Sequence, residues 1–458
     1  MIENLRIRNF KAWQDTGDIR LAPLTVFFGT NSSGKTSLHQ LLLLLKQTAQ
    51  STDRKRVLHL GDRTTLVDLG SFSDAVFDHD TTSVLEFELS WRLPSEIVAN
   101  DPIGGNSFTS DMMSFQAAIS QGAKERLQVD ALRFDLGDPS QDGLQMKMTR
   151  QSKGYKLEST AKNYRLVRQK GRGWPLPAPV HFYGFPDEAV AYYQNTGFVA
   201  DLTLQLEALL GATFYVGPLR EYPERLYTWS GEVPEHAGTR GERAVEALLA
   251  GADRWFNFKP KQKTRSLQEV VAQRLKNMQL IDSFEVKQIA KNRKEYEVLV
   301  RTRRKAAQVK VTDVGFGVSQ VLPVIVECFY VPAHSIVIFE QPEIHLHPRV
   351  QADLADLFID AIHAREDSVG RGIQLIVESH SEHFLRRLQR RIAEQQVNSD
   401  EVALYFCEPK ANKASIRALD TDLFGNILNW PEHFFGDEMG DLAAMTEAAM
   451  QRKMKERA

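Results

Sequence analysis

The chain has 458 residues, of which 42% are apolar and 25% charged, as is ordinary for a globular protein with a sizeable core. Its 57 lysines and arginines nearly balance 59 aspartates and glutamates, and the net charge of −2 excludes binding to DNA by net charge alone. Cys328 and Cys407 are its only cysteines, which excludes a disulfide scaffold and a cysteine zinc site and fits a cytoplasmic location.

The N-terminal residues predict a strand, a glycine-rich turn and a helix. Residues 24–28 (LTVFF) are continuously apolar, as in a strand buried on both faces, and residues 38–50 favour a helix. Between them, GTNSSGKT fits the phosphate-binding pattern G-x-x-x-x-G-K-[ST] at every fixed position. In such a loop Lys35 reaches the β- and γ-phosphates and the Thr36 hydroxyl ligates Mg²⁺. The predicted nucleotide-binding residues are Gly29, Asn31, Ser32, Ser33, Gly34, Lys35, Thr36 and Ser37.

The middle of the chain is predicted to be an inserted α+β region. A strand is expected at 84–91, and residues 127–170 alternate repeatedly between apolar and polar side chains, as in an antiparallel sheet. Helices are expected at 199–210 and 242–256.

From residue 267 the chain alternates between helices and strands, the pattern of a parallel, helix-covered sheet. Helices are expected at 267–278, from 318, at 348–364 and at 381–395; strands are expected within 284–312 and at 335–339, 373–377 and 402–408. Because Pro323 and Pro332 interrupt the apolar stretch 320–339, we expect no membrane span. The expected divisions are 1–91 and 267–400 for the two parts of the nucleotide-binding head, 92–266 for the insertion, and 401–458 for strands and a helix that complete the head.

A second motif predicts the metal-holding acid. SIVIFE (335–340) is an apolar strand that ends in a carboxylate, and Glu340 is therefore expected beside the phosphate-binding loop as a ligand of Mg²⁺ or its water shell. Gln341 follows where ABC-type ATPases usually carry a catalytic glutamate, and a carboxamide orients water but cannot accept its proton at neutral pH. Three interpretations stay open: a water-orienting Gln341, Glu343 as the base, or weak or absent hydrolysis.

Two further motifs point to the γ-phosphate. VESHS (377–381) follows the last core strand and places His380 where it would face this phosphate, although a histidine capping the next helix is an alternative. The glycine-rich helix start DVGFGVSQ (313–320) offers free N–H groups to an anion, with a plain capped helix as the alternative. Because the chain's own loop covers its own phosphates, Gly317, Ser319 and Gln320 would serve a partner subunit, which predicts an ATP-dependent head-to-tail dimer.

Together the motifs resemble an ABC-type ATPase head of the SMC/RecF/OLD group. The segments that carry the resemblance are LRIRNFKAW (5–13), LTVFFGTNSSGKTS (24–37), VGFGVSQVLPV (314–324), IVIFEQPEIHLHPRVQADL (336–354) and LIVESHSEHFLRRL (375–388). YVGPLREYPERLY (215–227) and NWPEHFFGDEMGDLAAM (429–445) are similar to stand-alone OLD-like bacterial ATPases that lack a Toprim nuclease domain. The resemblance implies an α/β fold: a P-loop NTPase head with a mostly parallel, helix-covered core sheet, an antiparallel β portion and a large inserted α+β region.

The resemblance also implies a function. An ATPase of this kind would bind ATP and Mg²⁺, hydrolyse ATP slowly because of Gln341, dimerise on ATP, and control a separate effector, a nuclease or toxin, in bacterial anti-phage defence. The alternatives are a RecF-like ATPase that binds double-stranded DNA in repair, and a non-hydrolysing, nucleotide-gated interaction module. No glutamine stands in a convincing Q-loop, where Asp68 or Ser71 would have to substitute.

Three basic clusters are candidates for contact with DNA. Each is more typical of a solvated face than of a nucleic-acid interface. They are Arg301, Arg303, Arg304 and Lys305 in one hairpin; Arg386, Arg387, Arg390 and Arg391 on one helix; and Lys259, Lys261, Lys263 and Arg265 in one loop.

Overall fold

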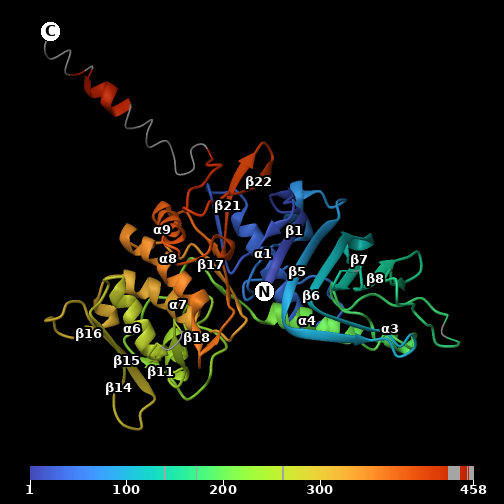
Figure 1. The fold of residues 1–458 in the computed structure, drawn as a ribbon, viewed down its shortest axis with the longest axis horizontal. Coiled ribbons are helices and arrows are strands. Elements are labelled where there is room, and N and C mark those ends of the chain that lie inside the picture. Colours follow the sequence, from blue (N-terminus) through green and yellow to red (C-terminus); the bar gives the residue numbers. More distant parts are fainter. Residues whose placement is uncertain (139–140, 172, 260–261, 432–443, 451, 453–458) are drawn as a thin grey trace.

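A six-stranded, mostly parallel sheet forms the middle of the fold, in the order β10-β17-β20-β4-β21-β22 (Figure 1). The computed structural model describes residues 1–138, 141–171, 173–259, 262–431, 444–450 and 452. Neighbouring strands are parallel except β22, which is antiparallel to β21. The strands are β4 (Leu24–Gly29), β10 (Thr213–Val216), β17 (Ile336–Glu340), β20 (Gln374–Glu378), β21 (Val402–Lys410) and β22 (Lys413–Ala418).

Alternate residues of the central strands face two different hydrophobic cores, which explains why these strands are continuously apolar. Phe27, Ile338 and Ile376 belong to a core that contains the leucines of helices α1 (Lys35–Ala49) and α4 (Val199–Gly211). Phe339 and Val377, one residue on, belong to a core built with the helices on the other face. Those helices are α5 (Ala244–Ala250), α6 (Leu267–Asn277), α7 (Gly317–Tyr330), α8 (Pro348–His363) and α9 (Glu382–Ala393).

An eight-stranded antiparallel sheet shares the core of α1 and α4, and appears in blue and teal in Figure 1. Its order is β2-β1-β5-β6-β7-β8-β9, with β3 paired to β1. The predicted boundary after residue 91 falls inside β5, because β5 pairs with β1 along one edge and with β6 along the other. The strands are β1 (Ile2–Phe10), β2 (Trp13–Asp15), β3 (Ile19–Arg20), β5 (Leu85–Asn100), β6 (Ser107–Gln121), β7 (Leu127–Leu136), β8 (Leu144–Arg150) and β9 (Tyr155–Glu158).

Two small sheets and several short helices complete the described chain. Helix α5 is shorter than the predicted helix at 242–256, because residues 255–257 instead form a strand that pairs with two others. One small sheet contains β11 (Tyr227–Thr228), β14 (Ser283–Gln288), β15 (Glu295–Arg301) and β16 (Val309–Lys310); the other contains β12 (Trp255–Asn257), β13 (Arg265–Ser266), β18 (Arg365–Glu366) and β19 (Val369–Gly370). The short helices are α2 (Phe72–Ala75), α3 (Asp187–Ala191), η1 (Phe77–His79), η2 (Ala123–Glu125), η3 (Val311–Asp313) and η4 (Ser399–Glu401).

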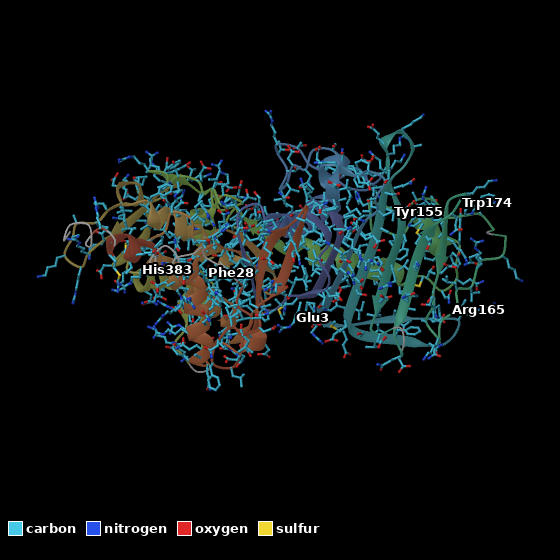
Figure 2. All side chains as sticks on the ribbon, turned by 90° about the horizontal axis from the view of Figure 1, so that it is seen from above. Glu3, Phe28, Tyr155, Arg165, Trp174 and His383 are labelled. Atoms are coloured by element: carbon cyan, nitrogen blue, oxygen red, sulfur yellow. The ribbon has the colours of Figure 1, made fainter. Side chains whose placement is uncertain are left out.

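The molecule is elongated across the plane of the central sheet. In Figure 2, Trp174 and Arg165 lie at one end beyond the antiparallel sheet, His383 of α9 lies toward the other end, and Phe28 of β4 lies between them. This arrangement confirms the predicted α/β fold class with an antiparallel portion. In the described part of the chain, no helix has both the length and the apolarity needed to cross a membrane.

Candidate nucleotide-binding site

The phosphate-binding loop connects β4 to α1 through a tight, left-handed backbone. Gly29 has φ 146° and Gly34 has φ 86°. A Cβ atom on Gly29 would lie 2.0 Å from the carbonyl oxygen of Cys407, so only glycine fits there. Trp13 of β2 donates its indole N–H to the Gly34 carbonyl at 3.0 Å. The loop is therefore held from below by β21 and from the side by β2.

The Lys35 side chain lies buried inside the loop. Its Nζ donates to the carbonyl oxygens of Thr30 at 2.7 Å and Gly29 at 3.1 Å, and lies 4.0 Å from Oε1 of Glu378. Burial lowers the pKa of Lys35, while the nearby Glu378 carboxylate opposes that shift. The loop thus holds a cation where a phosphate-binding loop needs one.

A cavity of about 420 Å³ opens over this loop. Its lining contains every predicted phosphate-binding residue except Gly29, which closes β4 beneath it. The wall opposite the loop contains Asp74, Asp78 and His79, rather than Asp68 or Ser71. The full lining is Lys11, Ala12, Asn31, Ser32, Ser33, Gly34, Lys35, Thr36, Ser37, Gln40, Asp74, Val76, Asp78, His79, Gln341, Glu378 and His380. A larger hollow of about 750 Å³ lies beside Tyr215 and contains none of the loop residues.

Glu378 is a functional candidate that the sequence analysis did not single out. It ends β20 and accepts a hydrogen bond from the Thr36 hydroxyl at 2.9 Å. Burial, and then the neighbouring Glu340 carboxylate, raise the pKa of Glu378 to about 7, against the effects of Lys35 and Thr36. The sequence signal was available: like Glu340, Glu378 is an acid that closes an apolar strand.

Glu340 stands one strand farther from the loop. Its Oε2 accepts a hydrogen bond from the Tyr215 hydroxyl at 2.6 Å, and burial together with Glu340 raises the pKa of Tyr215. Arg220 is buried behind this turn and donates to the carbonyl oxygens of Gln341 at 3.2 Å and Glu340 at 3.5 Å. Its hydrogen-bond partners are backbone carbonyls of the Glu340 turn, so Arg220 holds that turn in place.

The other candidate catalytic residues take different positions. Gln341 and His380 line the cavity, and the Gln341 N–H donates to the Glu378 carbonyl at 2.9 Å. Glu343 is not in the lining; it is buried, and its Oε1 accepts the backbone N–H of His380 at 2.6 Å. Burial raises the pKa of Glu343, whereas burial and Lys35 lower the pKa of His380 to about 4. His380 is therefore a neutral imidazole at pH 7.

Gly317, Ser319 and Gln320 lie in the first turn of α7 and are not in the lining of the cavity over this chain's own loop. Ser319 and Gln320 are buried, and the Ser319 hydroxyl donates to the Phe316 carbonyl at 2.8 Å. The side chain that projects at this helix start is Phe316, which is 39% exposed.

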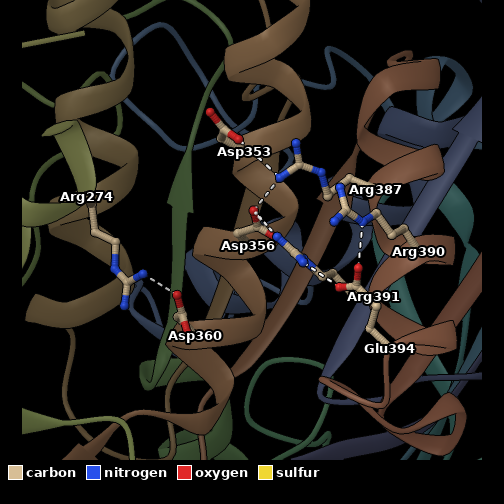
Figure 3. Close-up of polar contacts among 8 residues, drawn as sticks. All are labelled: Arg274, Asp353, Asp356, Asp360, Arg387, Arg390, Arg391 and Glu394. Atoms are coloured by element: carbon tan, nitrogen blue, oxygen red, sulfur yellow. Dashed lines mark hydrogen bonds and ion pairs between the residues drawn. The ribbon is translucent and has the colours of Figure 1, made fainter. Parts of the chain in front are cut away.

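The arginines of α9 are engaged in ion pairs (Figure 3). Arg387 and Arg391 both contact Asp356 of α8 at 2.5 Å, and Arg391 also contacts Glu394. Arg390 contacts Glu394 at 2.7 Å and Arg386 contacts Glu382 at 3.2 Å. The structure therefore supports the solvated, self-paired interpretation of this cluster over contact with DNA. Of the loop cluster at 259–265, Lys261 lies outside the described residues.

A phosphate-binding loop after a central parallel strand, with buried acids closing the adjacent strands, defines a P-loop nucleotide-binding protein with an ABC-type ATPase head. The sequence places it more narrowly: residues 1–168 and 256–385 match the family described as AAA ATPase domain, and the chain belongs to that family. Residues 397–445 match a second family, described as a protein of unknown function (DUF3696). Residues 432–443 of that segment lie outside the described residues.

Three similar solved structures are head domains of SMC proteins. An SMC head bound to the C-winged helix domain of ScpA is 11% identical, covers 92% of this chain and 98% of its own, and has a TM-score of 0.42. The head from Thermotoga maritima is 8% identical, with coverages of 92% and 99% and a TM-score of 0.38. A head with an extended coiled coil, bound to the C-terminal domain of ScpA derived from Pyrococcus furiosus, is 10% identical, with coverages of 91% and 96% and a TM-score of 0.39. Comparison with curated proteins gives no match.

Proposed function

We propose that this chain is a cytoplasmic, ATP-binding and slowly hydrolysing ABC-type ATPase of the OLD-like kind that dimerises on ATP and controls a separate effector, a nuclease or toxin, in bacterial anti-phage defence. The observation that carries ATP binding is the convergence of the loop, Glu378 and His380 on one cavity at the carboxyl ends of β4 and β20. The effector and the defence role rest on the resemblance of segments 215–227 and 429–445 to OLD-like ATPases.

Slow hydrolysis is supported by the positions of the candidate bases. Gln341 lines the cavity, but its carboxamide orients water without accepting a proton. The Oε1 atom of Glu343 is engaged by the backbone N–H of His380, so this acid stabilises the His380 segment. We therefore assign Gln341 to water orientation and His380 to contact with the γ-phosphate.

The dimer is supported by an exposed aromatic cluster at the start of α7, made of Phe316, Tyr222 and His345. The Phe316 ring lies 5.5 Å from that of Tyr222 and 5.6 Å from that of His345, between ring centroids. His345 follows β17, so the cluster stands at the same sheet edge as Gln341. Tyr222 is 72% exposed, and exposed aromatics of this kind are enriched in protein interfaces. A second copy, docked head to tail, would cover this cluster and bring its nucleotide to Ser319 and Gln320.

Sedimentation velocity tests this dimer. With Mg²⁺ and a non-hydrolysable ATP analogue, the wild-type chain should double in mass, and without nucleotide it should stay monomeric. Phe316→Asp should weaken the dimer about 30-fold, since buried interface aromatics contribute about 2 kcal/mol. Phe424→Asp is the matched control, because Phe424 is 75% exposed in a loop after β22, and it should dimerise like the wild type. Dimers that form equally well without nucleotide would contradict the proposal.

A DNA partner is favoured by one feature, the basic cluster at the β15–β16 connection. Arg303, Arg304 and Lys305 are exposed there, and none of the ion pairs among the described residues includes them. They are therefore the part of the three clusters most available to phosphates.

A further inference from the structure

The Glu378 carboxylate lies nearer to the phosphate-binding loop than the acid predicted to hold the metal. In register, Glu378 stands beside Glu340 of β17 on one side and beside Phe27 of β4 on the other. Side chains two residues apart on a strand share a face, so Glu378 points with Ile376 toward α1, and Glu340 points with Ile338 to the same side. Both acids thus face the start of α1, with Glu378 one strand closer to the loop.

The hydrogen bonds follow this order of strands. Glu378 Oε2 accepts from the Thr36 hydroxyl, and Glu378 Oε1 lies 4.0 Å from Lys35 Nζ. Glu340, in contrast, receives the Tyr215 hydroxyl from β10, on the side away from the loop. Glu378 lines the cavity and Glu340 does not. The acid in contact with the predicted metal ligand Thr36 is therefore Glu378.

These groups fit Mg²⁺, which prefers oxygen ligands and is usually bound through one or two carboxylates together with substrate phosphates. The threonine hydroxyl of a phosphate-binding loop supplies one such oxygen. We propose that Glu378 is the carboxylate that, with Thr36, holds the Mg²⁺ of the bound nucleotide, while Glu340 supports the site from behind. This inference rests on the proposed function, since it requires ATP to bind at this loop.

The test measures how strongly metal improves nucleotide binding. A fluorescent ATP analogue is titrated into the full chain in Mg²⁺ and in EDTA, and the ratio of the two dissociation constants is the metal enhancement. Glu378→Gln keeps the size of the side chain but removes its charge, and should lower the enhancement about tenfold or more. Binding in EDTA should persist, because the loop and Lys35 are unchanged. Glu340→Gln makes the same change one strand away and should lower the enhancement less than Glu378→Gln does.

Further outcomes decide the proposal. Glu378→Asp, which keeps a carboxylate, should retain more of the enhancement than Glu378→Gln, and binding in EDTA shows that each variant is folded. If Glu378→Gln keeps the wild-type enhancement, the proposal is overturned, whether or not Glu340→Gln loses it. Loss of ATP turnover with the enhancement intact would also overturn it and would make Glu378 an acceptor of the water proton. Failure of the wild type to bind nucleotide in either buffer would instead overturn the proposed function, and this inference with it.

Discussion

Replacement of Lys35 by alanine is expected to lower the rate of ATP hydrolysis on the order of 100-fold or more, the effect of removing one preorganised group that stabilises charge in a transition state. Lys35 is buried, and its Nζ lies within a loop whose backbone encloses the phosphate position. An alanine supplies no cation there, so the developing charge on the γ-phosphoryl group loses its principal positive partner. Steady-state phosphate release measures the effect.

The control for Lys35→Ala is Lys413→Ala. Lys413 lies at the β21–β22 turn, where its Nζ donates to the side chain of Gln14, and this variant should hydrolyse ATP at the wild-type rate. If Lys35→Ala retains full turnover, the activity arises elsewhere and the assignment of the site is wrong.

Replacement of Arg371 by alanine is expected to lower the free energy of unfolding by about 3–5 kcal/mol, the range for breaking a buried ion pair. The Arg371 side chain is fully buried, and burial lowers its pKa to about 10. It donates to the carbonyl oxygens of Cys328 at 2.8 Å and of Val331, which end α7, and lies 3.4 Å from Glu366. Its removal leaves helix-end carbonyls and a carboxylate without their cation.

Urea unfolding, followed by circular dichroism and tryptophan fluorescence, measures this loss. Arg293→Ala is the control, because the Arg293 side chain is 69% exposed and its ion pair spans 3.9 Å, so its effect should stay within about 0.5 kcal/mol. An Arg371→Ala variant as stable as the wild type would show that the end of α7 is held by other contacts. Arg254, which donates to Tyr330 and Glu366, is the nearest such contact.

The elements that carry the site were predictable because their patterns are local. The apolar run of β4, the loop pattern and the leucines of α1 stand next to one another in the chain, and SIVIFE shows its strand and its acid in six letters. The parallel alternation after residue 267 predicted α6, α7, α8, α9 and the strands between them. The antiparallel sheet was predicted in part: β7, β8 and β9 alternate clearly, whereas β6 matched no predicted element.

The contacts that complete the site could not be predicted, because they join distant residues. Trp13 beneath Gly34, Tyr215 on Glu340 and Glu378 on Thr36 each depend on which strands are neighbours in the sheets. The order β17-β20-β4 places Glu378, rather than Glu340, next to the loop. The sequence shows both acids at strand ends, but it does not show which strand lies between the other two.

The central claim is that this chain binds ATP at the loop 29–36, and calorimetric titration tests it most directly. Titration of the wild-type chain with Mg²⁺-ATP should show saturable binding of one nucleotide per chain, and Lys35→Ala should bind it at least several-fold more weakly. No binding heat at any temperature tried, together with no change in a competing fluorescent nucleotide, would contradict the account. Equal binding by Lys35→Ala and the wild type would show that the nucleotide site lies elsewhere.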